Sequence, residues 1–196
     1  MHKWKRVETA GGLRFRSALT PHEAAVLKNL VAKMLGLLNE RESSSPSGEL
    51  EALTGIKVGN EQRPGDPTLC RLLPDFYKPE DKDRLDPLAL DAADNLNAAL
   101  RGLHEPEIID AKRVAAQQLL DTVPESGGRL ELTEESANAW IVAVNDLRLA
   151  LGVMLEISPQ RPERAPAGHT LSAHFDVYQW LTVLQEYLVL ALMETR

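Results

Sequence analysis

The sequence predicts a mainly α-helical protein: a single-domain bundle of five to six helices around a central apolar helix at about residues 134–156, with a small N-terminal β-hairpin. Aromatic residues make up only 5% of the 196 residues, so Leu, Ala and Val must build the core, a composition typical of helical proteins. Apolar residues recur at spacings of three and four along most of the chain. Neither a repeat nor a second core divides it, so we expect one domain over residues 1–196.

Residues 1–18 predict the hairpin. Two short extended runs meet at Gly11-Gly12, and apolar residues alternate with Arg14 and Arg16 along the second run. An isolated hairpin is only marginally stable in water, so we expect it to pack on the helices. The side chains expected to make that contact are Trp4, Leu13 and Phe15.

Helix signals divide the rest of the chain. A capping box at Thr20–Glu23, with Pro21 at the first helical position, predicts a helix to about residue 42. Arg129–Leu132 reads either as a short strand or as an extended segment leading into a cap at Thr133. A proline-rich flexible loop is expected at residues 158–169. Further helices are expected at about residues 48–54, 69–73, 86–101, 107–122, 134–156 and 172–194, with a break at 102–106.

The predicted central helix is apolar on nearly every side, which favours a position inside the fold. Its few polar residues then need partners, because an unpaired buried charge is costly. We expect a network of ion pairs and hydrogen bonds that ties this helix to the one at 69–73, and we favour it over acid–base catalysis by the same groups. Replacing Arg148 by Ala should strand a buried carboxylate and strongly destabilise the fold. The expected members are Arg71, Asp75, Asn145, Asp146 and Arg148.

The net charge of −7 conceals an asymmetry. Residues 1–33 hold seven Lys and Arg against two Glu, a net charge of +5, which leaves −12 for the remainder. A basic end could contact phosphates or an acidic partner, could protect a strand edge from aggregation, or could pack on the acidic body of its own chain. The candidate contact residues are Lys3, Lys5, Arg6, Arg14 and Arg16.

Redox, metal and cofactor signals are weak. A single cysteine, Cys70, excludes an intramolecular disulfide; beside Arg71 it is a candidate redox residue, and the alternative is an inert small apolar residue. His169, His174 and Asp176 come nearest to a metal cluster but do not have a zinc-motif spacing. No phosphate loop, nucleophile elbow or dinucleotide fingerprint is visible, so we expect no cofactor and no enzymatic activity.

The last predicted helix carries an apolar seam of the a/d kind. The seam could pack within one chain or join two chains, and we favour a homodimer because the end of the helix is apolar on every side. No secretory signal or membrane-length apolar run is visible, so we expect a cytoplasmic protein without membrane contact. The seam consists of Val177, Leu181, Leu184, Leu188 and Leu192.

Several segments resemble an actinobacterial family of unknown function that includes the oxidative-stress regulators of the AosR type. They are Asp66-Pro67, Arg71–Asp75 with Tyr77, Trp140 with Asn145–Gly152, and Tyr178 with the final Leu-rich helix. The resemblance implies a non-enzymatic, cytoplasmic, transcription-associated protein, with some members responding to oxidation and cooperating with a stress sigma factor. This sequence departs from an intramolecular disulfide switch, since it holds only Cys70.

Three functions follow in order of preference. The first is a transcription-associated regulator whose basic hairpin contacts DNA or the transcription machinery, a sigma factor or RNA polymerase. The second is a helical adaptor or scaffold that binds only proteins. The third, a metal-dependent enzyme, would require a site built on His169 and His174.

Overall fold

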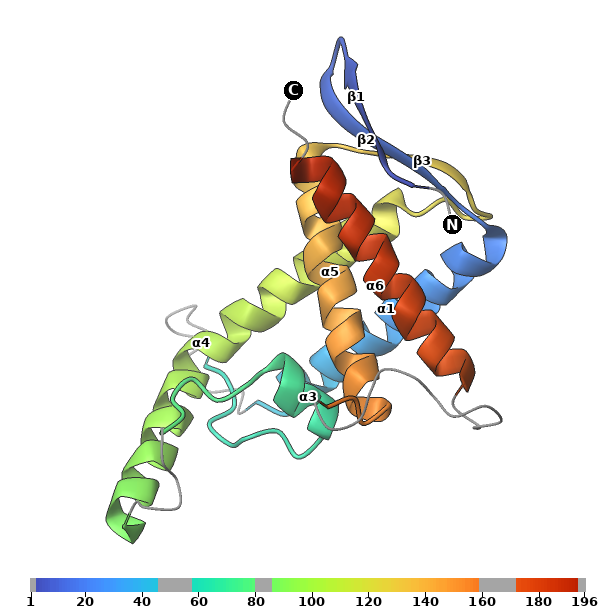
Figure 1. Ribbon diagram of the computed structural model, residues 1–196. Helices are drawn as coiled ribbons and strands as arrows, with labels where there is room; N and C mark the ends of the chain where they lie inside the picture. The colour runs from blue at the N-terminus through green and yellow to red at the C-terminus, as the bar shows by residue number, and fades with distance from the viewer. Residues whose placement is uncertain (1–2, 46–57, 80–85, 159–171, 194–196) are drawn as a thin grey trace. The chain divides into compact units, whose positions relative to one another are not determined.

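The computed structural model describes residues 3–45, 58–79, 86–158 and 172–193, and its described part is mainly α-helical, as the sequence predicts. The expected helix at 48–54, most of the 158–169 loop and His169 fall outside these residues. Figure 1 shows the elements in chain order. They are β1 (Lys5–Thr9), β2 (Gly12–Leu19), α1 (Pro21–Ser43), α3 (Pro67–Leu72), α4 (Pro87–Thr122), β3 (Gly128–Leu132), α5 (Glu134–Met154) and α6 (Ser172–Met193).

The chain divides into two compact units. The first unit comprises Met1–Leu35 and Lys112–Arg196, and the second comprises Gly36–Ala111. Helices α1 and α4 each contribute residues to both units. A single domain over the whole chain stays a prediction.

The predicted hairpin is present, and a third strand joins it. Strands β1, β2 and β3 form an antiparallel sheet in that order, so the segment leading to Thr133 is a strand. The register alternates as the hairpin pattern predicts, with Arg16 beside Lys5 and Glu131 on one face. The opposite face is the packed one. Its buried side chains are Phe15, Leu19, Leu130 and Leu132.

Two tryptophans attach the sheet to the helices of the first unit. The Trp4 ring meets the Trp140 ring edge-on, with centroids 5.7 Å apart, and the Trp4 indole donates to the Leu184 carbonyl at 3.3 Å. The Trp140 indole donates to the Thr122 hydroxyl at 2.7 Å. These bonds satisfy the polar end of each buried ring. They confirm that the hairpin packs on helices through Trp4.

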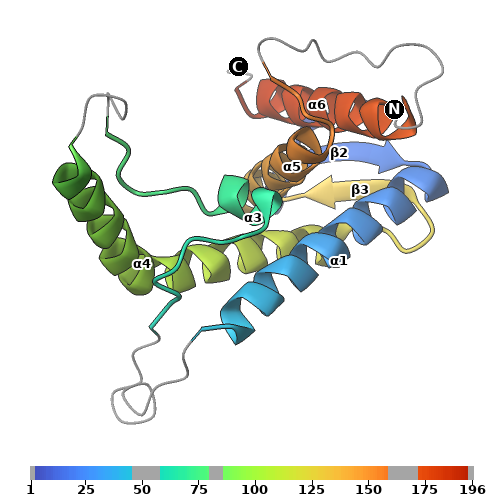
Figure 2. The ribbon, with the colours of Figure 1, turned by 90° about the horizontal axis from the view of Figure 1, so that it is seen from below.

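Helix α5 is only partly enclosed. Figures 1 and 2 both show α6 lying across it, and Trp140 and Leu147 are buried. Val142, however, is 47% exposed, and Met154 is exposed as well. The sequence therefore identifies the central helix correctly but overstates its burial, because one stripe of it meets solvent.

Four of the predicted helix starts are confirmed by their capping bonds. The Thr20 N–H donates to the Glu23 carboxylate at 2.7 Å, and the Glu23 N–H donates back to the Thr20 hydroxyl at 3.2 Å, a complete capping box. The side chains that accept from the first turns of α3, α4 and α5 belong to Asp66, Asp86 and Thr133.

The predicted break at 102–106 is wrong, because α4 runs through it with Pro106 inside the helix. A proline cannot donate to the carbonyl four residues earlier, here that of Gly102. That carbonyl accepts instead from the Gly59 N–H at 2.8 Å. A neighbouring segment thus replaces the missing helical bond.

Candidate functional site

The exposed face of the sheet gathers positive charge. We call it the basic sheet face: Lys3, Lys5, Arg14, Arg16 and Arg129, with Glu131 among them. The strands place these side chains together because alternate residues share a face, and the antiparallel register sets Lys5 beside Arg16 and Arg16 beside Glu131. Five cations against one carboxylate give this small face a strong positive charge on a chain whose net charge is −7.

Part of the basic sheet face is hollowed into an open groove of about 770 Å³. Cationic side chains dominate its border. The lining residues are Lys3, Lys5, Arg16, Ser17, Ala18, Arg129, Leu130 and Glu131. A groove of this charge on an extended β-ribbon suits a polyanion whose phosphates follow the strands.

Glu131 partly neutralises the face. It accepts a hydrogen bond from Nε of Arg16 and lies 3.7 Å from Nε of Arg14. Lys3 lies over the Tyr187 ring, 5.4 Å from its centroid, which holds this lysine near the start of β1. Lys5 and Arg129 are exposed. The arrangement leaves positive charge toward solvent on both outer strands.

Four of the five predicted contact residues therefore share this face, and Arg6 does not. Arg6 lies opposite Phe15 in the register, on the side of the sheet that packs on the helices. Arg129, the cation that β3 adds, is not among the residues predicted from the sequence. Its signal was present in the alternation of Arg129 with Leu130, but only the pairing of β3 with β2 brings it beside the hairpin.

The predicted network of Arg71, Asp75, Asn145, Asp146 and Arg148 is wrong in its partners. Arg71 is exposed, and Asn145 is half-buried. Asp146 pairs with Lys112 of α4, at 2.7 Å between Oδ1 and Nζ. Asp75 pairs with Arg101, at 2.6 Å. Each carboxylate is thus neutralised inside its own unit by a cation that the sequence analysis did not select.

Arg148 contacts no carboxylate among the described residues. Its Nε donates to the Thr182 hydroxyl at 3.0 Å, and its Nη1 donates to Oε1 of Gln185 at 2.7 Å, both on α6. The guanidinium also lies over the Tyr178 ring, 5.5 Å from its centroid. Arg148 therefore joins α5 to α6 through neutral partners.

Asp146 is the buried carboxylate of the first unit among the described residues. It is buried, and its Oδ2 has no hydrogen-bond partner among the described residues. Burial raises the pKa of Asp146 above its ordinary value of 3.8, and the bond and charge of Lys112 lower it by less. The pair links α5 to α4, and neither residue lines the groove of the basic sheet face or the groove between α1, α5 and α6.

The second unit contains a buried charge cluster that we define as Arg41, Asp75, Arg101 and Glu105. Glu105 is 2% exposed, and its carboxylate accepts hydrogen bonds from Nε of Arg41 at 2.6 Å and from Nη1 of Arg101 at 3.0 Å. Arg101 also bonds Asp75 and the Leu73 carbonyl. Two guanidinium groups meet two carboxylates, so the cluster is neutral and well bonded, as burial requires. Its one local signal is the four-residue spacing of Arg101 and Glu105 on α4.

Cys70 is half-buried in α3, and its thiol donates to the Pro64 carbonyl at 2.9 Å. This hydrogen bond uses the thiol to hold the turn that precedes α3. The geometry is that of the inert alternative, and a redox role stays a prediction.

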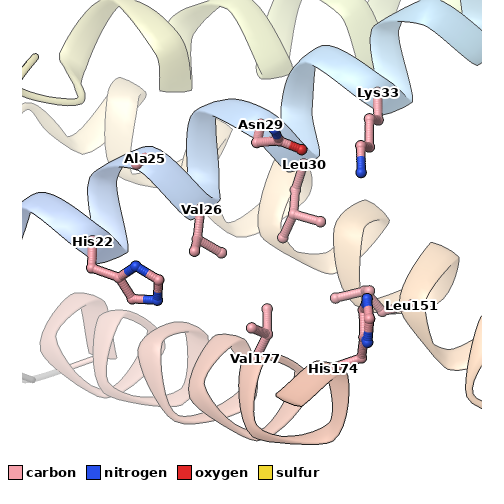
Figure 3. A pocket seen from close by; sticks show the side chains of 9 residues that line it. All are labelled: His22, Ala25, Val26, Asn29, Leu30, Lys33, Leu151, His174 and Val177. Carbon is pink, nitrogen blue, oxygen red and sulfur yellow. The ribbon is translucent and has the colours of Figure 1, made fainter. Parts of the chain in front are cut away.

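The histidines lie apart from any metal cluster. His22 and His174 border a groove of about 350 Å³ between α1, α5 and α6, and Figure 3 shows them on opposite sides of it with Lys33 at one end. The rest of the lining is Ala25, Val26, Asn29, Leu30, Leu151 and Val177. A cation there would meet Lys33 and no lining carboxylate. Within the described residues no three His, Cys, Asp or Glu converge on one point.

The predicted dimer seam is wrong, because most of its leucine side chains pack inside their own chain. Leu181, Leu184 and Leu188 are each at most 1% exposed in a single copy, with Val177 and Leu192 half-buried. The contact of α6 with α5 and the bond from Trp4 to the Leu184 backbone cover this side of the helix. These leucines are therefore not available to a second chain. Of the described helices, none is both long and apolar enough to cross a bilayer.

Comparison with known proteins gives a consistent result over the whole chain. The family described as "Domain of unknown function (DUF2017)" matches residues 1–192. A protein of Mycobacterium leprae named putative oxidative stress regulator AosR is 78% identical over 195 residues, covering 100% of this chain and 90% of the relative. The Mycobacterium bovis and Mycobacterium tuberculosis proteins named oxidative stress regulator AosR are each 73% identical over 196 residues, with the same coverage. No solved structure matches the chain.

Proposed function

This chain belongs to the DUF2017 family, and from that membership and its charge pattern we propose that it is a regulator of the oxidative stress response that contacts DNA through the basic sheet face. The observation that carries the proposal is the gathering of five cations on the exposed side of the sheet. The names of its relatives support a stress-linked regulator, and the positive charge of the basic sheet face supports DNA as the target.

A β-ribbon is a suitable shape for this contact. β-Sheet proteins can place strands in a groove of DNA, and the cations on the outer face of this three-stranded sheet can reach the phosphates beside the groove. In this chain the packed face, with Phe15 and Leu132, fixes the ribbon on the helices. The outer face can then bind without unfolding its support. Such binding acts without catalysis, and we propose no enzymatic step.

The test is the binding of a fluorescent 25-base-pair duplex, measured by anisotropy over a series of salt concentrations. Affinity should fall steeply as salt rises, because each phosphate contact releases counterions. The double variant Lys5→Ala/Arg129→Ala should bind more weakly and reduce the salt slope by roughly one to two. Glu131→Gln should bind more tightly, since it removes the carboxylate from the face.

The matched control is Lys28→Ala/Lys33→Ala, which removes the same charge from α1. It should leave binding close to that of the unaltered chain. Equal losses in the two double variants would mean that attraction is diffuse and that the sheet face is not the site. No binding at low salt would favour the second function, a helical adaptor that contacts a sigma factor, RNA polymerase or another protein directly.

A further inference from the structure

The first half of α4 presents an apolar stripe to solvent. Leu88 is 82% exposed, Leu96 45% and Leu103 69%, and Ala92 and Ala99 between them are exposed as well. Successive members lie four, four, three and four residues apart, so they share one side of the helix over about 22 Å. Neighbouring Ala93 is buried, so the helix packs on its unit by another side. We call these five residues the α4 stripe.

The α4 stripe has the residue pattern of a surface that packs against another helix. Isolated exposed leucines are ordinary, but three in one row, separated by alanines at near-heptad spacing, form the seam that a second helix packs on. Charged side chains lie outside the row. The stripe also lies wholly within the second unit, whose own buried side chains leave it uncovered.

We propose that the α4 stripe pairs with the same stripe of a second copy of this chain, in antiparallel orientation. With the two-fold axis between residues 96 and 99, Leu96 faces Ala99 of the partner subunit, and Leu103 faces Ala92 of the partner subunit. Each of these layers joins one large and one small side chain, which keeps the spacing of the two helices even, and Leu88 lies beyond them at the end of the stripe. A parallel pair would set leucine on leucine and alanine on alanine, in layers of alternating width.

Charge favours the same orientation. The N-terminal end of the stripe is acidic, with Asp86, Asp91 and Asp94 all exposed. A parallel pair would bring the two acidic ends together, whereas an antiparallel pair places them at opposite ends and aligns the helix dipoles favourably. A single helix pair of this length buries an area at the low end for specific interfaces, so we expect a dissociation constant in the micromolar range.

The first test is the average mass measured by sedimentation equilibrium from about 1 to about 200 µM, a range that brackets micromolar affinity. The mass should rise from 21.7 kDa toward twice that value. Leu96→Glu and Leu103→Glu should each weaken association at least about tenfold, as loss of a central interface residue does. The matched control is Leu190→Glu, which alters a leucine of α6 that is 51% exposed and should associate like the unaltered chain.

Circular dichroism melting of each variant verifies that it is folded; the altered leucines are exposed, so we expect unchanged melting. A chain that stays at 21.7 kDa at the highest concentration overturns the proposal. Loss of association in Leu190→Glu alone also overturns it, since the interface would then lie on α6.

Cysteine cross-linking tests the orientation, in a Cys70→Ser background that keeps a donor to the Pro64 carbonyl. Residue 96 lies near the proposed axis, so Leu96→Cys should form a disulfide-linked dimer under mild oxidation. Two copies of residue 88 would lie more than about 20 Å apart, far beyond the reach of a disulfide, so Leu88→Cys should not. Cross-linking of Leu88→Cys as fast as Leu96→Cys would show a parallel pair and refute the proposed arrangement.

Discussion

Gly59 lies directly against the ring of Pro106. A Cβ added to Gly59 would stand 2.8 Å from Cδ of Pro106 and 3.1 Å from the Arg101 carbonyl oxygen. The close approach lets the Gly59 N–H reach the Gly102 carbonyl, which the proline leaves without a helical donor. One glycine therefore makes the proline tolerable inside α4.

Gly59→Ala should destabilise the protein by about 1 to 3 kcal/mol, because the new methyl group overlaps rigid ring and backbone atoms. Urea unfolding followed by circular dichroism measures the change. Gly65→Ala is the matched control, since a Cβ there meets nothing within 4 Å. If the two variants unfolded alike, Gly59 would not be held against Pro106.

Glu105→Ala should cost about 3 to 5 kcal/mol, because it leaves the guanidinium groups of Arg41 and Arg101 buried without their shared carboxylate. Chemical denaturation gives the free energy of unfolding. Glu107→Ala, an exposed change on the same helix, should be near neutral. A small loss in Glu105→Ala would indicate that water reaches the buried charge cluster.

Arg148→Ala should cost only about 1 to 3 kcal/mol, since it removes hydrogen bonds to Thr182 and Gln185 and leaves no carboxylate unpaired. This corrects the strong destabilisation that the sequence suggests. Chemical denaturation under the same conditions should compare the free energies of unfolding of Arg148→Ala and Glu105→Ala. A loss in Arg148→Ala as large as that in Glu105→Ala would mean that Arg148 neutralises a buried charge.

Asp146 should make stability depend on pH in the acid range. Its folded pKa is raised above 3.8, so the folded state binds the proton more tightly than the unfolded state does. This contribution is fully present below about the unfolded value of 3.9 and is lost as pH rises through the raised folded pKa. Asp146→Asn removes it, so the unaltered chain should gain melting temperature relative to the variant as pH falls through that window. A difference that does not change with pH would show that Asp146 titrates normally.

Local signals predicted local structure well. The capping box at Thr20–Glu23, the cap at Thr133 and the alternation around Gly11-Gly12 each act over a few residues. The backbone bonds that they satisfy lie within one turn or one strand pair, so the sequence alone is sufficient to place them. The grouping of cations on the hairpin followed from the same alternation.

What the sequence by itself determined is therefore the starts of four helices, the hairpin and the sign of its exposed face. Only the tertiary structure decided the charge partners, the continuity of α4 and the burial of the α6 leucines. Arg41 pairs with Glu105, which is 64 positions away in the sequence, and the Gly59 N–H donates to the Gly102 carbonyl. Such contacts depend on which segments pack together, and a buried charge binds whichever opposite charge the packing brings within reach.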